Sequence, residues 1–248
     1  MNARSKAKIG WLIAYADVLT LLITFFMMML ILYKTEVSEI QRWGEAKVDR
    51  SYAFLQTQLE KQQLDMFQLK RTAQGIYLRI QNPAAFETAS YLPAPELSQQ
   101  LADLSKLLVT VPLFQVGDEQ NTPSYVQQAL KGGYKWLVEV RVEGHTDNDP
   151  IDPNSRLRNN WFLSAMRAQS VMQALYQQSQ LPAQLFSVAG YGEYHPLVAN
   201  DTVGHKQLNR RVEILITAGF QQETEQLKAL PAIPQERLPK FPSEVIAN

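Results

Sequence analysis

A single charged residue, Asp17, interrupts an otherwise apolar run from Trp11 to Tyr33. With the two residues before it, the run has about 25 residues, or roughly 37 Å of helix, which exceeds a hydrocarbon core of about 30 Å. We therefore expect a transmembrane helix over residues 9–33. A carboxylate within such a helix costs about 2 to 3 kcal/mol on insertion scales, so a plain anchor would not carry it. Asp17 is a candidate functional residue.

Two hydroxyl side chains accompany this carboxylate. Thr20 and Thr24 follow Asp17 at i+3 and i+7, so the three share one helix face while apolar residues fill the others. The stripe could hydrogen-bond to another membrane helix. It could instead line an ion route, where Asp17 binds a cation and the hydroxyls replace lost water. Helix association alone rarely needs an ionisable group, so we favour the ion route.

The composition limits what the rest of the chain can be. The 248 residues have zero net charge and 46% hydrophobic content, which fits one membrane helix and one domain of ordinary size. Balanced charge argues against a nucleic-acid partner. The absence of cysteine excludes disulfides and thiol nucleophiles. No nucleophile elbow, phosphate loop or catalytic carboxylate pair is visible, so we expect neither an enzyme nor a cofactor.

The residues flanking the apolar run indicate its orientation. Arg4, Lys6 and Lys8 precede it without an acidic residue, whereas Lys34, Glu36 and Glu39 follow it. The excess of positive charge places residues 1–8 in the cytoplasm and the bulk of the chain across the membrane. A cleaved signal peptide is the alternative, but the run is too long and no small-x-small site follows it.

A linker is expected over residues 34–74. From Glu36 to Lys70, apolar residues recur at steps of three and four, apart from a gap at Gln62 and Gln63. This pattern predicts a long amphipathic helix that pairs with a second copy. It could serve as a spacer, or its first part could fold back on the membrane.

Residues 75–218 read as an α+β domain, with one sheet against helices. Alternating or continuous apolar residues predict four strands, at Gly75–Gln81, Trp136–Glu143, Ser187–Tyr191 and Arg211–Thr217. Helical spacing predicts two helices, at Pro93–Val111 and Asn160–Gln178. Residues 112–133 look like an irregular insertion with one short helix near Ser124–Leu130, and residues 219–248 form a proline-rich tail.

The membrane segment resembles the single transmembrane helix of MotB-type stator subunits. Their signature is an aromatic-Ala-Asp-x-x-Thr core, which here is Tyr15, Ala16, Asp17 and Thr20.

Three further stretches resemble the peptidoglycan-binding domain shared by OmpA, Pal and MotB. They are VEGHTDNDPI (142–151) with NNWFLSAMRAQSV (159–171), GYGEYHPLVANDT (190–202) and LNRRVEILI (208–216). The departures from the MotB pattern are Phe162, where MotB proteins usually have Glu, and the insertion after the first helix.

The resemblance implies that the domain grips the diaminopimelate-containing stem peptide of the cell wall. A guanidinium would bind a carboxylate of the ligand, and a carboxylate would bind its ammonium group. The implied peptidoglycan-binding residues are Thr146, Asp147, Asn160, Leu163, Arg167 and Arg211. Arg211 could equally tie the preceding loop by hydrogen bonds.

The whole chain then resembles the B subunit of an ion-driven rotary motor in the bacterial inner membrane. Asp17 would carry a proton or a sodium ion, with Thr20 and Thr24 beside it. The resemblance implies two B subunits within five multispanning A subunits, with the C-terminal domain in the periplasm. It also implies a gating role for the stretch after the membrane.

Three alternatives remain open at this point. The first is a related non-flagellar motor, such as that of Zorya-type phage defence or of surface motility. The second is a passive peptidoglycan tether without ion flux, against which Asp17 argues. The third is a metal site, because His145, Asp147 and Asp149 alternate like ligands, but no second ligand cluster supports it and we expect none.

Overall fold

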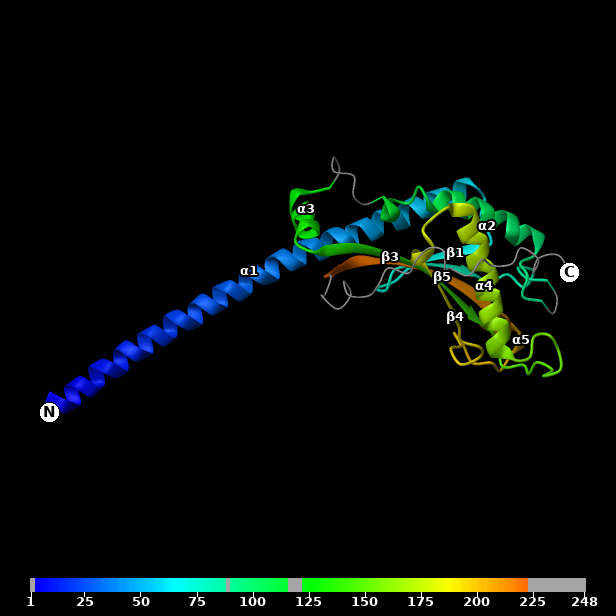
Figure 1. Ribbon diagram of the computed structural model, residues 1–248. Coiled ribbons are helices and arrows are strands. Elements are labelled where there is room, and N and C mark those ends of the chain that lie inside the picture. Colours follow the sequence, from blue (N-terminus) through cyan, green and yellow to red (C-terminus); the bar gives the residue numbers. More distant parts are fainter. Residues whose placement is uncertain (1–2, 88–89, 116–121, 223–248) are drawn as a thin grey trace.

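The longest element of the protein is a continuous helix, α1, at Ala3–Lys61. The computed structural model describes residues 3–87, 90–115 and 122–222, with the backbone alone for residues 3–9 and 32–38. At 1.5 Å per residue, α1 is about 88 Å long. Its N-terminal part extends away from the remainder of the described chain (Figure 1). The membrane segment and the linker are therefore one rod.

The linker helix ends earlier than the sequence predicted. Helix α1 stops at Lys61, and Phe67–Arg71 forms strand β1 instead of continuing the helix to Lys70. Gln63 adopts the left-handed conformation, with φ 55°, and so breaks the helix at the gap in the apolar pattern. The amide of Leu64 donates to the Leu59 carbonyl at 3.0 Å and caps the end. The sheet thus begins before the expected domain boundary at residue 75.

The domain contains one five-stranded sheet in the order β1-β2-β5-β3-β4. Only β3 and β4 pair in parallel, and the other neighbours are antiparallel. The remaining strands are β2 (Ile76–Ile80), β3 (Tyr134–His145), β4 (Phe186–Gly190) and β5 (Arg211–Gln222). The expected start of the tail at residue 219 was wrong, because β5 pairs with β3 as far as Gln222.

Helices cover one face of this sheet, and α4 crosses the strands (Figure 1). Both predicted long helices are confirmed, as is the short helix in the insertion. The helices are α2 (Pro95–Leu108), α3 (Ser124–Lys131) and α4 (Asn160–Ser179), with short 3-10 turns at Pro112–Phe114 (η1) and Ala183–Leu185 (η2). A helix that the sequence analysis missed, α5, lies at Val203–Asn209.

The core lies between the sheet and these helices. Alternate residues of β3 and β5 point into it, including Val140, Val142 and Ile214, all fully buried. At the ends of β3 and β4, Gly144 and Gly190 let α4 approach closely, because a Cβ at either position would overlap the backbone of Ser164 or Ala165. This close approach fixes the start of α4 beside the loops that follow the two strands.

The C-terminal half of α1 packs against the sheet where β3 begins and β5 ends. The Trp43 ring lies 5.4 Å from the Trp136 ring and 5.7 Å from the Phe220 ring, measured between centroids. Gly44 is buried against Trp136, whose indole N–H donates to the Leu113 carbonyl at 3.0 Å. The apolar face predicted for the linker is therefore packed against this chain's own domain, and its pairing with a second copy stays a prediction.

Candidate functional site

Within α1, residues Gly10–Ile31 have a mean hydropathy of 2.1 and form a segment long and apolar enough to cross a membrane. The hydroxyl of Thr20 donates to the Asp17 carbonyl at 2.8 Å, and that of Thr24 donates to the Leu21 carbonyl at 2.9 Å. Both hydroxyl protons are thus used by the helix itself, which leaves the oxygen lone pairs free to accept. The Asp17 carboxylate has no hydrogen-bond or ion-pair partner among the residues that the structure describes.

A second group of polar side chains lies at the end of the sheet, where β3 runs into the loop before α4. Asp147 is almost fully buried, and its carboxylate forms an ion pair with the guanidinium of Arg210. Its other oxygen accepts the amide of Asp149 at 3.2 Å. Beside it, Thr146 is 3% exposed and its hydroxyl has no hydrogen-bond partner in the described part of the chain. A buried, unpaired hydroxyl is able to bind a ligand group.

Arg167 approaches the same place from α4. Its guanidinium stacks 4.9 Å from the Phe86 ring centroid and donates from Nε and Nη2 to the Ser90 carbonyl, at 3.3 and 3.2 Å. Burial, and then the nearby charge of Arg210, lowers the pKa of Arg167 to about 10, while Asp147 opposes this shift. Arg167 is still charged at neutral pH, so two guanidiniums, those of Arg167 and Arg210, lie near the Asp147 carboxylate.

Asn160 holds the two loops of the site together. Its side-chain amide donates to the carbonyls of Asp147 and Asp149, at 3.3 and 3.1 Å, and to the Glu193 carboxylate at 2.9 Å. The preceding residue, Asn159, caps α4 by accepting the Phe162 amide at 2.8 Å. Asn160 is therefore engaged in positioning the loops, with its side-chain oxygen left to accept.

Leu163 is buried, 8% exposed, and lies on α4 between Asn160 and Arg167. The structure thus brings together five of the six predicted binding residues. The sixth, Arg211, is turned elsewhere: it is almost fully buried and pairs with Glu213 at 2.9 Å. It also donates to the His195 carbonyl at 3.2 Å, which matches its alternative role of tying the preceding loop. Its neighbour Arg210 supplies the charge to Asp147, because successive residues at a strand point in opposite directions.

Neither Arg210 nor Glu193 is among the binding residues predicted from the sequence. The sequence signal for Arg210 was its position directly before the strand that begins at Arg211, where its side chain points to the opposite side from that of Arg211. No local signal marks Glu193, since its link to Asn160 spans 33 residues of chain.

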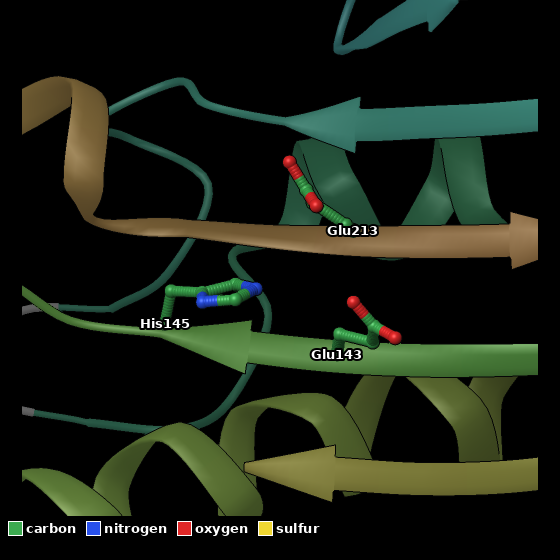
Figure 2. A group of neighbouring side chains, drawn as sticks. All are labelled: Glu143, His145 and Glu213. Atoms are coloured by element: carbon green, nitrogen blue, oxygen red, sulfur yellow. The ribbon is translucent and has the colours of Figure 1, made fainter. Parts of the chain in front are cut away.

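Figure 2 shows a further cluster on the neighbouring strands β3 and β5, made of the buried residues Glu143, His145 and Glu213. One ligand atom from each lies within 4.8 Å of the others. Glu213, however, already accepts from Arg79 at 2.7 Å and from Arg211 at 2.9 Å, and Glu143 pairs with Arg141 at 3.1 Å. With three guanidiniums around two carboxylates, the local charge disfavours a divalent cation.

The alternating triplet noted in the sequence is likewise divided among other partners. Asp147 pairs with Arg210, and Asp149 pairs with Lys206 at 2.5 Å. His145 stacks on Tyr191, with ring centroids 5.3 Å apart. That this protein binds no structural metal stays a prediction.

Known families match two separate parts of the chain. The model described as "OmpA family" matches residues 119–210, and the model described as "Membrane MotB of proton-channel complex MotA/MotB" matches residues 2–46. The first match includes Asp147 and its neighbours Arg167 and Arg210, and the second match includes Asp17. The region similar to the OmpA family thus follows the apolar segment Gly10–Ile31 of α1.

Individual proteins agree with these matches. Motility protein B of Bacillus subtilis is 48% identical over 77 residues, which is 31% of this chain and 29% of that protein. YtxE of the same organism is 25% identical over 243 residues, covering 86% of this chain and 90% of YtxE. The crystal structure of a MotB-like protein from Desulfovibrio vulgaris superposes with a TM-score of 0.52 at 18% identity, covering 75% of this chain and 96% of that one, and shows the same fold.

In two separate regions, this chain is therefore similar to the OmpA family and to MotB-type membrane proteins. The match to Motility protein B spans less than a third of that protein's length.

Proposed function

We propose that this protein is the B subunit of an ion-driven rotary motor. In this proposal Asp17 binds and releases the transported ion within a complex with a multispanning A subunit, and the OmpA-like domain holds the unit against peptidoglycan. The proposal rests on two features of one chain. One is a carboxylate in an apolar helix that has no partner among the described residues, and the other is a clamp formed by the buried Asp147 with the partly buried Arg167 and Arg210. The match of residues 2–46 to a MotA/MotB membrane family supports the same assignment.

The ion step depends on the chemistry of the membrane helix. One helix cannot enclose a channel, so the A subunit must surround it. The free lone pairs of Thr20 and Thr24 suit either a sodium ion or the water that delivers a proton. Binding of the ion neutralises Asp17 and changes which contacts with the surrounding subunits are favourable, which would drive stepwise rotation.

The wall-binding step uses the clamp. A ligand carboxylate would bind Arg167 and Arg210, and its ammonium group would bind Asp147, as a zwitterionic centre of the stem peptide requires. The ion pair between Asp147 and Arg210 then has to widen to admit the ligand. The unpaired hydroxyl of Thr146 offers one further hydrogen bond.

The assembly follows from the sequence flanks and the family. Arg4, Lys6 and Lys8 favour a cytoplasmic N-terminus in the inner membrane, so that the domain lies in the periplasm. Two copies of this chain within five A subunits is the expected stoichiometry. A non-flagellar motor would use the same physics, and the neighbouring genes would distinguish the two outputs.

Sedimentation of full-length protein with purified peptidoglycan tests the clamp. Asp147→Ala or Arg167→Ala should abolish co-sedimentation, because loss of one partner from a partly desolvated charged pair costs a few kcal/mol. Lys106→Ala, at an exposed ion pair on α2, is the matched control and should sediment as wild type. Wall binding retained by the folded Asp147→Ala, Arg167→Ala double variant would remove these residues from the site.

Ion leak in cells that express the A subunit tests the gating role of residues 36–49. Deletion of that stretch should raise the leak if it plugs the channel. Trp136→Ala is the control variant. It removes the ring that Trp43 contacts on the domain, but it leaves residues 36–49 unchanged. It should leave the leak low. Equal leak in the deletion and in the wild type would leave only the spacer role.

A further inference from the structure

Two large aromatic side chains stand exposed beside the clamp. Trp161 is 51% exposed and Tyr194 is 62% exposed, yet their rings lie together with centroids 5.2 Å apart and planes inclined by 31°. They come from different elements, the first turn of α4 and the loop between β4 and α5. Neither ring is needed to fill the core.

The clamp itself holds this pair in place. The side chains of Asn160 and Glu193 are hydrogen-bonded at 2.9 Å. Trp161 directly follows Asn160 and Tyr194 directly follows Glu193, so this bond holds the two aromatic residues close together. The backbone of the second loop is fixed as well, because the Tyr194 amide donates to the Tyr191 carbonyl at 3.2 Å. Gly192, with φ +54°, brings this loop against the Trp161 backbone. The rings are thus a preorganised surface next to the proposed peptide site.

We propose that Trp161 and Tyr194 form a platform for a sugar ring of the glycan strand, adjoining the stem-peptide site. This inference rests on the proposed wall-binding function and extends it to the second component of the same polymer. A pyranose presents a flat face of polarised C–H groups, which fits the electron-rich face of an aromatic ring. Its hydroxyl groups would donate hydrogen bonds to the carboxylate of Glu193, the residue next to Tyr194.

Glu193, the residue next to Tyr194, supplies a carboxylate that can accept hydrogen bonds from hydroxyl groups, which suits an uncharged sugar. A second copy of this chain is the remaining occupant, since paired exposed aromatic residues also occur in protein interfaces. The experiment must therefore separate sugar binding from self-association.

Calorimetric titration of the full-length protein in detergent with two soluble probes makes this distinction. One probe is a disaccharide-stem peptide, and the other is the same peptide without its sugars. The wild type should bind the disaccharide-peptide more tightly. Trp161→Ala should weaken that binding about tenfold and leave the affinity for the bare peptide unchanged. Trp161→Phe should retain most of the affinity, because it keeps a ring in the same place.

The opposing outcomes are distinct from one another. Equal weakening toward both probes would make Trp161 a structural residue of the clamp and overturn the platform. Unchanged binding of both probes by Trp161→Ala would also overturn it while leaving wall binding intact. A shift in sedimentation velocity from dimer to monomer would assign the pair to self-association instead. A wild type that binds neither probe would defeat the wall-binding function, and the platform with it.

Discussion

Two carboxylates of this protein, Glu213 and Asp17, differ in whether the described residues supply a partner for them. Glu213 lies within the sheet, 5% exposed, and accepts from the guanidiniums of Arg79 and Arg211 at 2.7 and 2.9 Å. Asp17 lies in the membrane segment and has no such partner among the described residues. The domain therefore neutralises the buried charge of Glu213, whereas none of the described residues pairs with Asp17. This difference is what separates a structural carboxylate from a candidate ion carrier.

Asp17→Asn should have the largest effect and tests whether Asp17 carries the ion. The amide keeps the size and the hydrogen bonds but cannot titrate, so motor output should vanish if Asp17 carries the ion. The variant should still insert, because Asn is less costly in the bilayer than Asp. Swimming or an equivalent motor readout, with membrane fractionation as the control for insertion, checks this.

The same variant should also act as a dominant negative when it is expressed with the wild type. It should still recruit the A subunit and bind the wall, and so occupy places that active units would fill. Asp17→Glu keeps a titrating group on a longer stem and should retain partial output. Full activity of Asp17→Asn would remove the ion-carrier role and favour the passive tether.

Arg211→Met tests the other carboxylate. Removing this guanidinium leaves the buried Glu213 with Arg79 alone, and breaking a buried pair typically costs about 3 to 5 kcal/mol. We expect a loss of that order in the free energy of unfolding, measured by urea denaturation. Wall binding per folded molecule should change little, since Arg211 is turned away from Asp147. A folded, fully stable variant that lost only wall binding would return Arg211 to the site.

His145 predicts how stability depends on pH. Burial, followed by the charge of Arg211, lowers the pKa of His145 to about 3 from its ordinary 6.5, while Glu213 opposes the shift. His195 and Arg79 add to the lowering. Between these two pH values the unfolded chain binds a proton that the folded protein does not, so stability falls as the pH falls and is level above about 6.5.

From pH 6.5 to 4.5 this difference corresponds to about 2 to 3 kcal/mol, and His145→Gln should remove that part of the slope. Glu143, whose pKa is raised by burial, acts in the opposite direction, but the wild type and the variant share it. Urea denaturation across this range compares the two slopes. Parallel curves would show that His145 does not stay neutral in the folded protein.

Lys206→Met should have the smallest effect. Its ion pair with Asp149, at 2.5 Å, is partly solvent-exposed, and exposed pairs contribute about 0 to 1 kcal/mol. Thermal unfolding should therefore move by only a few degrees at most. The contrast with Arg211→Met measures how much of the stability comes from burial of the charge rather than from the ion pair as such.

The local patterns of the sequence predicted the fold closely where a period was clear. The apolar run, the helix Asn160–Ser179 and the strand around Val140 and Val142 follow from side-chain periodicity, which needs no distant contact. The break after Lys61 was visible as the gap at Gln62 and Gln63. Strand β1 was missed because its five residues also fit a helical spacing, and only pairing with β2 selects the strand.

For the site, the amino-acid sequence by itself determined which residue types are available: one charged group in the membrane segment, and the Thr146, Asp147 and Arg167 motif. The tertiary structure decided that Arg210, and not Arg211, pairs with Asp147, and that the linker face packs on Trp136. It also decided that Trp161 meets Tyr194. Sequence periodicity fixes which way a side chain points along its own element. The meeting of two elements depends on sheet register and helix approach, which are set by contacts far apart in the chain.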